Sequence, residues 1–198
     1  SVPLLAPLLR DPDPHVMDAA AQALGKIGGA DATKALLTAL NTATEDRYPY
    51  ILSAILLVAE SCLDHGDRDT AVAVYSDLLR SDNPRLARIA GLRGVAVLDP
   101  MRAAPLLVEA FNDPNRDMQS AAALAVRELK VVRAVQPLIA HLSGLPPPSQ
   151  KLLIEALADR GERDAANTVL ASVHSPDTDV VLSAVKALAV IGDSSTVP

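Results

Sequence analysis

Histidine is the side chain in this sequence best suited to bind a metal ion or to act as a general acid or base. A metal site needs several ligands that converge on one point, and two residues of one helix converge when they are three or four positions apart. The four histidines are His15, His65, His141 and His174. No two of them have that spacing, and each lies at or near the end of an expected helix. We therefore expect solvated or capping histidines and no metal site.

Other patterns that could support catalysis are also missing. The acidic pairs Glu45-Asp46 and Asp67-Asp69 fall in expected turns, where carboxylates cap helices far more often than they catalyse. The stretch Gly25-Lys26-Ile27-Gly28-Gly29 ends a helix, whereas a phosphate-binding loop opens one. Nucleophile-elbow spacing is absent as well. We expect a protein that is not an enzyme and that holds no cofactor.

Composition excludes several classes of partner. The formal net charge of −6 argues against a nucleic-acid binder and against docking on anionic lipid. No apolar run approaches twenty residues, so no membrane-spanning helix is expected. Cys62 is the single cysteine, and we expect it to act as a small buried hydrophobe. The sequence does not determine the cellular compartment, and the cytoplasm is weakly favoured.

An internal repeat indicates the architecture. Residues 16–28 and 180–192 share one thirteen-residue pattern in the same register. Its last position recurs at residues 28, 66, 99, 130, 161 and 192, so the spacing is constant at 31 residues from residue 99 onward. Fixed-period similarity of this kind is typical of stacked helical hairpins.

Each repeat contains an outer helix, a turn rich in Asp, Asn and Pro, and the patterned inner helix. The prediction is an all-α fold, a right-handed α-α superhelix (solenoid) of about six hairpins. Their expected ranges are 2–28, 31–66, 67–99, 99–130, 131–161 and 162–192. Residues 196–198 resemble the start of a seventh outer helix, and neither end resembles a polar capping repeat. We therefore expect residues 1–198 to be a single solenoid segment of a longer protein.

The pattern resembles the short bacterial type of HEAT-like repeat that also occurs in phycobilisome lyase subunits. The residues that carry the resemblance in the first repeat are Val16, Ala19, Ala20, Leu24, Ile27 and Gly28. The resemblance is weakest in the second repeat, and in the fifth Arg160 stands at the usual isoleucine position. It implies a solenoid whose inner helices line a concave surface, and it says little about function.

Two enzyme families built from HEAT-like repeats serve as comparisons. The resemblance to a di-iron hydroxylase would imply His-Glu pairs, and no histidine here is followed by glutamate. The resemblance to DNA-alkylation glycosylases would imply a basic groove with tryptophans, and this chain is acidic and has no tryptophan. Neither activity is expected.

A helical wheel of the repeated pattern indicates where a partner would bind. The first, fifth, eighth, ninth and twelfth positions share the face expected to pack on the outer helices, and the third, seventh and tenth point away from it. We predict a groove for a protein or peptide along the third and seventh positions. Its residues are Asp18, Gln22, Glu60, Ile89, Arg93, Ser120, Leu124, Lys151, Glu155, Leu182 and Lys186. The alternative is that its apolar members pack against neighbouring inner helices.

The second repeat contains another candidate site. Arg47, Tyr48 and Tyr50 surround a proline, and tyrosine and arginine are common at binding hot spots. The alternative is that these tyrosines cover alanine-rich neighbours.

The sequence thus predicts a non-enzymatic scaffold that binds another protein or a peptide. Two alternatives stay open, namely a phycobilin-lyase-like protein that handles tetrapyrroles and a structural spacer between other domains.

Overall fold

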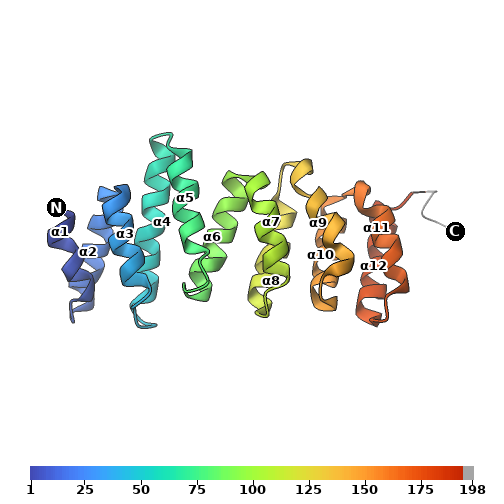
Figure 1. The fold of residues 1–198 in the computed structure, drawn as a ribbon, viewed down its shortest axis with the longest axis horizontal. Coiled ribbons are helices and arrows are strands. Elements are labelled where there is room, and N and C mark those ends of the chain that lie inside the picture. Colours follow the sequence, from blue (N-terminus) through green and yellow to red (C-terminus); the bar gives the residue numbers. More distant parts are fainter. Residues whose placement is uncertain (194–198) are drawn as a thin grey trace. The chain divides into compact units, whose positions relative to one another are not determined.

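The computed structural model describes residues 1–193, which form twelve α-helices, five short 3-10 helices and no strand (Figure 1). The α-helices are α1 (Val2–Leu5), α2 (Pro14–Ile27), α3 (Gly29–Leu40), α4 (Tyr48–Asp64), α5 (Arg68–Leu78), α6 (Arg85–Leu98), α7 (Pro100–Phe111), α8 (Arg116–Glu128), α9 (Gln136–His141), α10 (Pro147–Arg160), α11 (Ala166–Ala171) and α12 (Thr178–Ile191). The 3-10 helices are η1 (Ala6–Arg10), η2 (Val132–Ala134), η3 (Leu142–Gly144), η4 (Arg163–Ala165) and η5 (Ser172–His174).

These elements pair into hairpins at the places that the repeat predicts. The fold class, an all-α solenoid of about six hairpins, is confirmed. The seventh outer helix expected at 196–198 lies outside the described residues.

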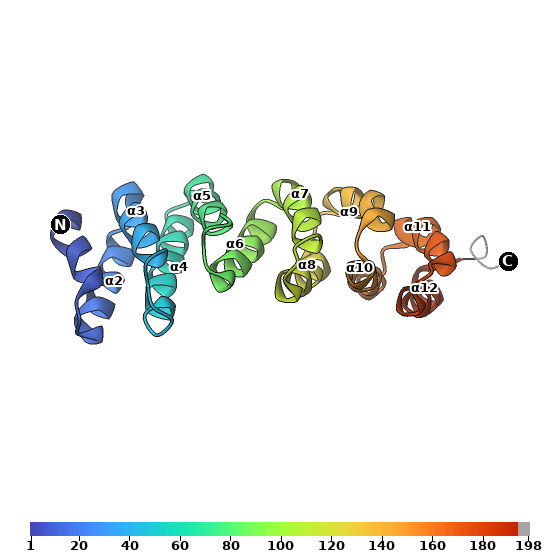
Figure 2. The same ribbon diagram turned by 60° about the horizontal axis from the view of Figure 1, so that its bottom comes forward.

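The chain divides into two compact units, Ser1–Gly94 (unit 1) and Val95–Pro198 (unit 2). Within each unit the odd-numbered helices form one layer, the outer helices, and the even-numbered helices form the other, the inner helices (Figure 2). Neighbouring inner helices pack on one another, α2 on α4 in unit 1, and α8 on α10 and α10 on α12 in unit 2.

Turn residues start the helices as the sequence predicts. The Asp13 carboxylate accepts a hydrogen bond from the backbone N–H of His15 at 2.8 Å, and that of Asp177 accepts from Asp179 and Val180. The Asn115 side-chain oxygen accepts in the same way from Asp117 at the start of α8. These side chains satisfy backbone donors that have no partner inside the helix.

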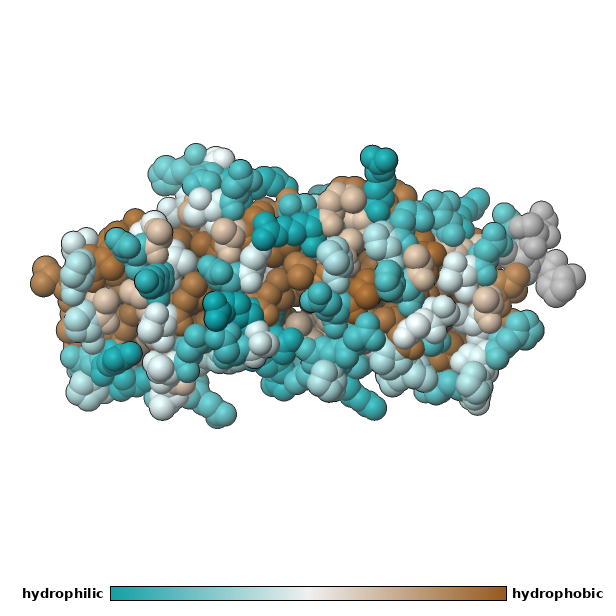
Figure 3. All heavy atoms as spheres, in the orientation of Figure 1, coloured by the Kyte–Doolittle hydropathy of each residue, from teal (hydrophilic) through white to brown (hydrophobic). Residues whose placement is uncertain are grey.

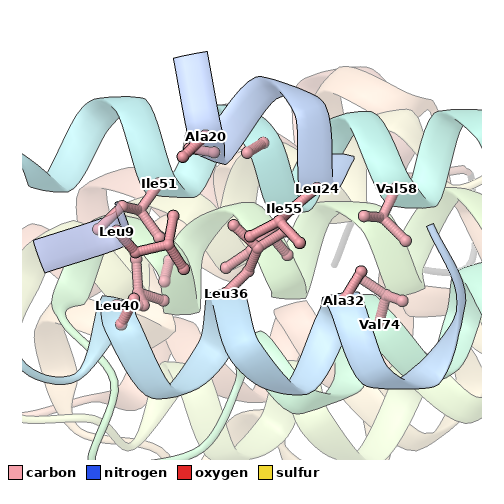
Figure 4. Packing of buried hydrophobic residues seen from close by; sticks show 14 of the residues in the cluster. Leu9, Ala20, Leu24, Ala32, Leu36, Leu40, Ile51, Ile55, Val58 and Val74 are labelled. Atoms are coloured by element: carbon pink, nitrogen blue, oxygen red, sulfur yellow. The ribbon is translucent and has the colours of Figure 1, made fainter. Parts of the chain in front are cut away.

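Large aliphatic side chains form the core of unit 1. Leu24 of α2, Leu36 of α3 and Ile55 of α4 are fully buried and lie against one another (Figure 4). Burying such a side chain contributes about 1.5–3 kcal/mol. This three-helix contact fixes the first two hairpins on each other.

The core of unit 2 combines alanine with larger apolar side chains. The buried residues of α8 are Met118, Gln119, Ala121, Ala122, Ala123, Ala125 and Val126. Phe111 of α7 and Leu138 of α9 are also fully buried, and they contribute most of the buried area beside the small alanines.

One expectation about the helical wheel is wrong for α2. That helix buries Met17, Ala21 and Gly25, whereas Val16 and Ile27, the first and twelfth positions, are exposed. The reason is the contact between inner helices, because α2 turns a face toward α4 as well as toward α3. A Cβ at Gly25, the tenth position, would lie 2.8 Å from the carbonyl oxygen of Ala54. In α12 the first, fifth, eighth and twelfth positions are buried, as predicted.

Candidate binding surface

The predicted groove residues all lie on inner helices, and none of them is buried. In unit 1, Asp18 and Gln22 are on α2, Glu60 is on α4, and Ile89 and Arg93 are on α6. In unit 2, Ser120 and Leu124 are on α8, Lys151 and Glu155 on α10, and Leu182 and Lys186 on α12. Asp18, Ile89, Lys151 and Glu155 are half-buried, and the others are exposed.

Three of these residues line one hollow in unit 1, between α2 and α4. Asp18, Gln22 and Glu60 share a cavity of about 590 Å³ with Tyr50. The side-chain amide of Gln22 donates a hydrogen bond of 2.9 Å to Asp18 Oδ2. The sequence analysis did not find the rest of the lining, which is Pro49, Ser53, Ala54, Leu56 and Leu57. These residues belong to the one inner helix that departs from the repeated pattern.

The three residues of the cluster Arg47, Tyr48 and Tyr50 have different environments. The Arg47 guanidinium donates to the carbonyl oxygens of Asp11 and Pro12 at 2.8 and 3.1 Å, which joins the start of α4 to the turn before α2. Tyr48 is buried in the core, and burial raises the pKa of its hydroxyl. Tyr50 is 45% exposed and reaches the hollow.

The polar groove residues of unit 2 connect its inner helices. Lys151 Nζ lies 3.7 Å from Asp179 Oδ2, and the Ser183 hydroxyl donates to Glu155 Oε1 at 3.1 Å. These contacts run from α10 to α12. Ser120 and Lys151 also line a smaller cavity of about 300 Å³.

Exposed apolar side chains stand beside these polar ones in unit 2. Leu124 of α8 is 41% exposed, and Leu182 of α12 is 51% exposed. Figure 3 shows, on one face of each unit, hydrophobic side chains interspersed with hydrophilic ones. Ile89, the third apolar residue of the predicted groove, is half-buried.

Another hollow of unit 1 lies between α3 and α5. It measures about 960 Å³, and its lining includes Lys34 of α3, Cys62 and His65 of α4, and Ala73 of α5. Cys62 is half-buried, and burial together with the charge of Asp67 raises the pKa of its thiol. The repeated pattern gave no signal for this hollow, because the pattern describes inner helices and two outer helices flank it.

Metal binding and membrane insertion were both tested on residues 1–193. In that range no group of three or more His, Cys, Asp and Glu residues could hold a metal ion. Nor does that part of the chain contain a helix long and apolar enough to cross a membrane. Two histidines bond to the backbone of their own helices, since His65 Nδ1 lies 2.7 Å from Ser61 O and His141 Nδ1 lies 2.7 Å from Pro137 O.

Comparison with known families bears on the first two hairpins. Residues 1–53 match the family of HEAT repeats. The N-terminal quarter of the chain therefore contains HEAT repeats, and the described residues after it continue as helical hairpins. No curated protein matches this chain.

Solved structures share the fold of this chain. Human deoxyhypusine hydroxylase in complex with glycerol is 21% identical, covers 96% of this chain and 73% of its own, and has a TM-score of 0.52. An engineered protein is also 21% identical, with 96% of both chains covered and a TM-score of 0.48. A designed armadillo repeat protein is 19% identical, with 96% of this chain and 100% of its own covered and a TM-score of 0.46. At these identities the likeness concerns the fold alone.

Proposed function

We propose that this protein is a non-enzymatic scaffold that binds a protein or peptide partner on the exposed faces of its inner helices. The observation that supports the proposal is the mixed character of those faces. Leu124 and Leu182 are exposed on the fourth and sixth hairpins, which lie on either side of the fifth hairpin with Lys151 and Glu155, and Lys186 is exposed one turn beyond Leu182. Exposed apolar side chains within a polar rim are the usual composition of a protein-binding surface.

The test is capture of partners from a lysate of the source organism, identified by mass spectrometry. One bait is the chain with its natural sequence, and the other carries Arg93→Glu, Leu124→Asp and Lys186→Glu. Circular dichroism and thermal unfolding establish that the two baits are equally folded. We expect at least one protein that the first bait retains and the second loses. Retention of the same proteins by both baits would place the function away from the inner helices.

The proposal also specifies the type of repeat, namely the short bacterial type that occurs in phycobilisome lyase subunits. A lyase-like role in tetrapyrrole handling is the alternative function, and one assay separates it from a scaffold. A bilin added to the chain shifts its absorbance spectrum in the case of a lyase-like protein and leaves it unchanged in the case of a scaffold.

A further inference from the structure

The hollow between α2 and α4, here called the α2–α4 trough, has a definite direction. Arg47, next to the start of α4, bonds to the backbone just before α2, so the two helices begin side by side. Further along both helices, Gly25 of α2 lies against Ala54. The helices are therefore parallel neighbours, and the trough runs along them.

The trough is long. Along α4 its lining follows the positions Tyr50, Ser53, Leu57 and Glu60, which form one helical stripe. At a rise of about 1.5 Å per residue, Tyr50 and Glu60 are about 15 Å apart along the axis. This length equals about three turns of a helix that lies along the trough.

The charges of the trough have one sign. Its ionisable residues are Asp18, near the Tyr50 end, and Glu60, at the other end. Among residues 1–193 neither carboxylate forms a salt bridge. Between them the lining combines Leu56, Leu57 and the ring of Tyr50 with the polar side chains of Ser53 and Gln22, whose amide donates to Asp18 Oδ2. The trough thus has apolar side chains between two carboxylates, and its lining contains no cation.

We propose that the α2–α4 trough binds a basic amphipathic helix. Two Lys or Arg side chains of that helix, about three turns apart, reach Asp18 and Glu60. An apolar side chain between them rests on Leu57, and the cation at the Asp18 end also contacts the face of Tyr50. This inference rests on the proposed scaffold function and specifies the chemistry of one partner segment.

The probe is a fluorescent 17-residue alanine-rich helical peptide with Lys at positions 4 and 14 and Leu at positions 7 and 11. These four positions have the same spacing as the stripe on α4. The matched probe carries Glu in place of both lysines. Binding to the full chain is measured by fluorescence anisotropy at 50 and 500 mM salt. We expect the lysine peptide to bind at least tenfold tighter than the glutamate peptide at low salt, and less tightly at high salt.

Two variants of equal charge locate the site. The first, Asp18→Lys with Glu60→Lys, is expected to lose the preference for the lysine peptide and to favour the glutamate peptide. The second, Glu45→Lys with Glu109→Lys, changes two exposed carboxylates outside the trough and should keep the original preference. Tyr50→Ala is expected to weaken binding of the lysine peptide severalfold, and Tyr50→Phe to preserve it. Circular dichroism confirms that each variant is folded.

A lack of preference between the peptides, or an equal loss in both charge variants, would overturn the trough proposal. It would leave the scaffold function standing if the capture experiment still separated its two baits, because those baits differ at residues outside the trough. Failure of the capture experiment together with a clear preference for the lysine peptide would leave the trough proposal standing. It would overturn the proposed role of the faces that carry Arg93, Leu124 and Lys186.

Discussion

The two units use the same hairpin and differ in where side chains bond to the preceding hairpin. Unit 1 depends on large aliphatic side chains such as Leu24, Leu36 and Ile55, which meet at the junction of three helices, and its Arg47 bonds to the turn before α2. Unit 2 also buries large side chains such as Phe111 and Leu138, and there the polar side chains bond to backbone carbonyls at the ends of helices of the preceding hairpin. Arg160 and Ser149 are the main examples.

Arg160 shows how this second arrangement works. Its guanidinium donates to the carbonyl oxygens of Val126, at 3.1 Å, and Leu129, at the end of α8. The Val126 carbonyl also accepts from the backbone N–H of Leu129, and the positive charge of Arg160 suits the negative end of the helix dipole. Glu162 lies 3.4 Å from the same guanidinium, and the two side chains are 11% and 9% exposed. These polar contacts tie the fifth hairpin to the end of α8 in the fourth.

The largest effect is expected for Arg160→Met. The substitution leaves the buried Glu162 carboxylate without its cation and removes the side-chain donor from the carbonyls of Val126 and Leu129. Loss of one partner of a buried pair costs about 3–5 kcal/mol. Urea unfolding gives the total, and hydrogen exchange should show the loss of protection concentrated at the end of α8. Arg160→Met combined with Glu162→Gln is expected to recover part of the stability; no recovery would mean that the carboxylate is not the source of the cost.

Ile55→Ala is the matching test in unit 1. The side chain is fully buried between α2 and α3, and its truncation is expected to cost about 3 kcal/mol through lost apolar contact and the cavity left behind. Hydrogen exchange should report the change in α2, α3 and α4. Ile55→Val serves as the control, with an expected cost of about 1 kcal/mol. Equal costs for the two substitutions would show that the junction collapses around the smaller side chain.

Ser149→Ala removes a single polar contact from unit 2. The buried hydroxyl of Ser149 donates to the carbonyl oxygen of Phe111 at the end of α7. The variant leaves that carbonyl buried without this donor, which costs about 1–3 kcal/mol. Urea unfolding measures the difference, and Ser143→Ala on the exposed surface is the control. A neutral result for Ser149→Ala would argue that polar contacts of this kind do not hold unit 2 together.

The smallest effect is expected at alkaline pH and in unit 1, which contains all three tyrosines. Burial raises the pKa of Tyr48 above its ordinary value, and burial with the nearby charge of Glu60 raises the pKa of Tyr75. Because the folded state holds these protons more tightly, their contribution to stability is complete below the ordinary pKa of about 10 and is lost as the pH rises through the higher folded values. Urea midpoints at pH 9 and pH 11 should therefore differ less in the variant with Tyr48→Phe and Tyr75→Phe. A pH dependence unchanged by these substitutions would assign the effect to other groups.

The sequence predicted those features that depend on neighbouring residues. The helix starts at Asp13, Asn115 and Asp177 follow from local capping chemistry, and the hairpins follow from the repeat. The wheel placed Val16 and Ile27 inside because it took account of the outer helix alone, whereas α2 also packs on α4. That second contact joins helices of two different hairpins, and the residue pattern of a single helix does not indicate it.

The candidate site was predicted in part for the same reason. Gln22 and Glu60 are exposed on inner helices and Asp18 is half-buried, and the wheel indicated their direction because it assigns one to each position. Leu56 and Leu57 were missed because α4 lacks the alanine pattern that fixes the register elsewhere. Arg160 was recognised only as a departure from the pattern, because its acceptors lie 31 and 34 residues earlier in the chain.

The polar contacts of unit 2 also limit how such a chain can evolve by gain or loss of repeats. Ser149 and Arg160 of the fifth hairpin bond to carbonyls of the fourth, and Glu155 accepts from Ser183 of the sixth. Deleting residues 131–161 would remove Ser149, Arg160 and Glu155 together. The fourth and sixth hairpins would then be neighbours without these hydrogen bonds between them. Duplication of the fourth hairpin would leave one copy followed by a hairpin without those donors. These polar contacts therefore fix the order of the last three hairpins.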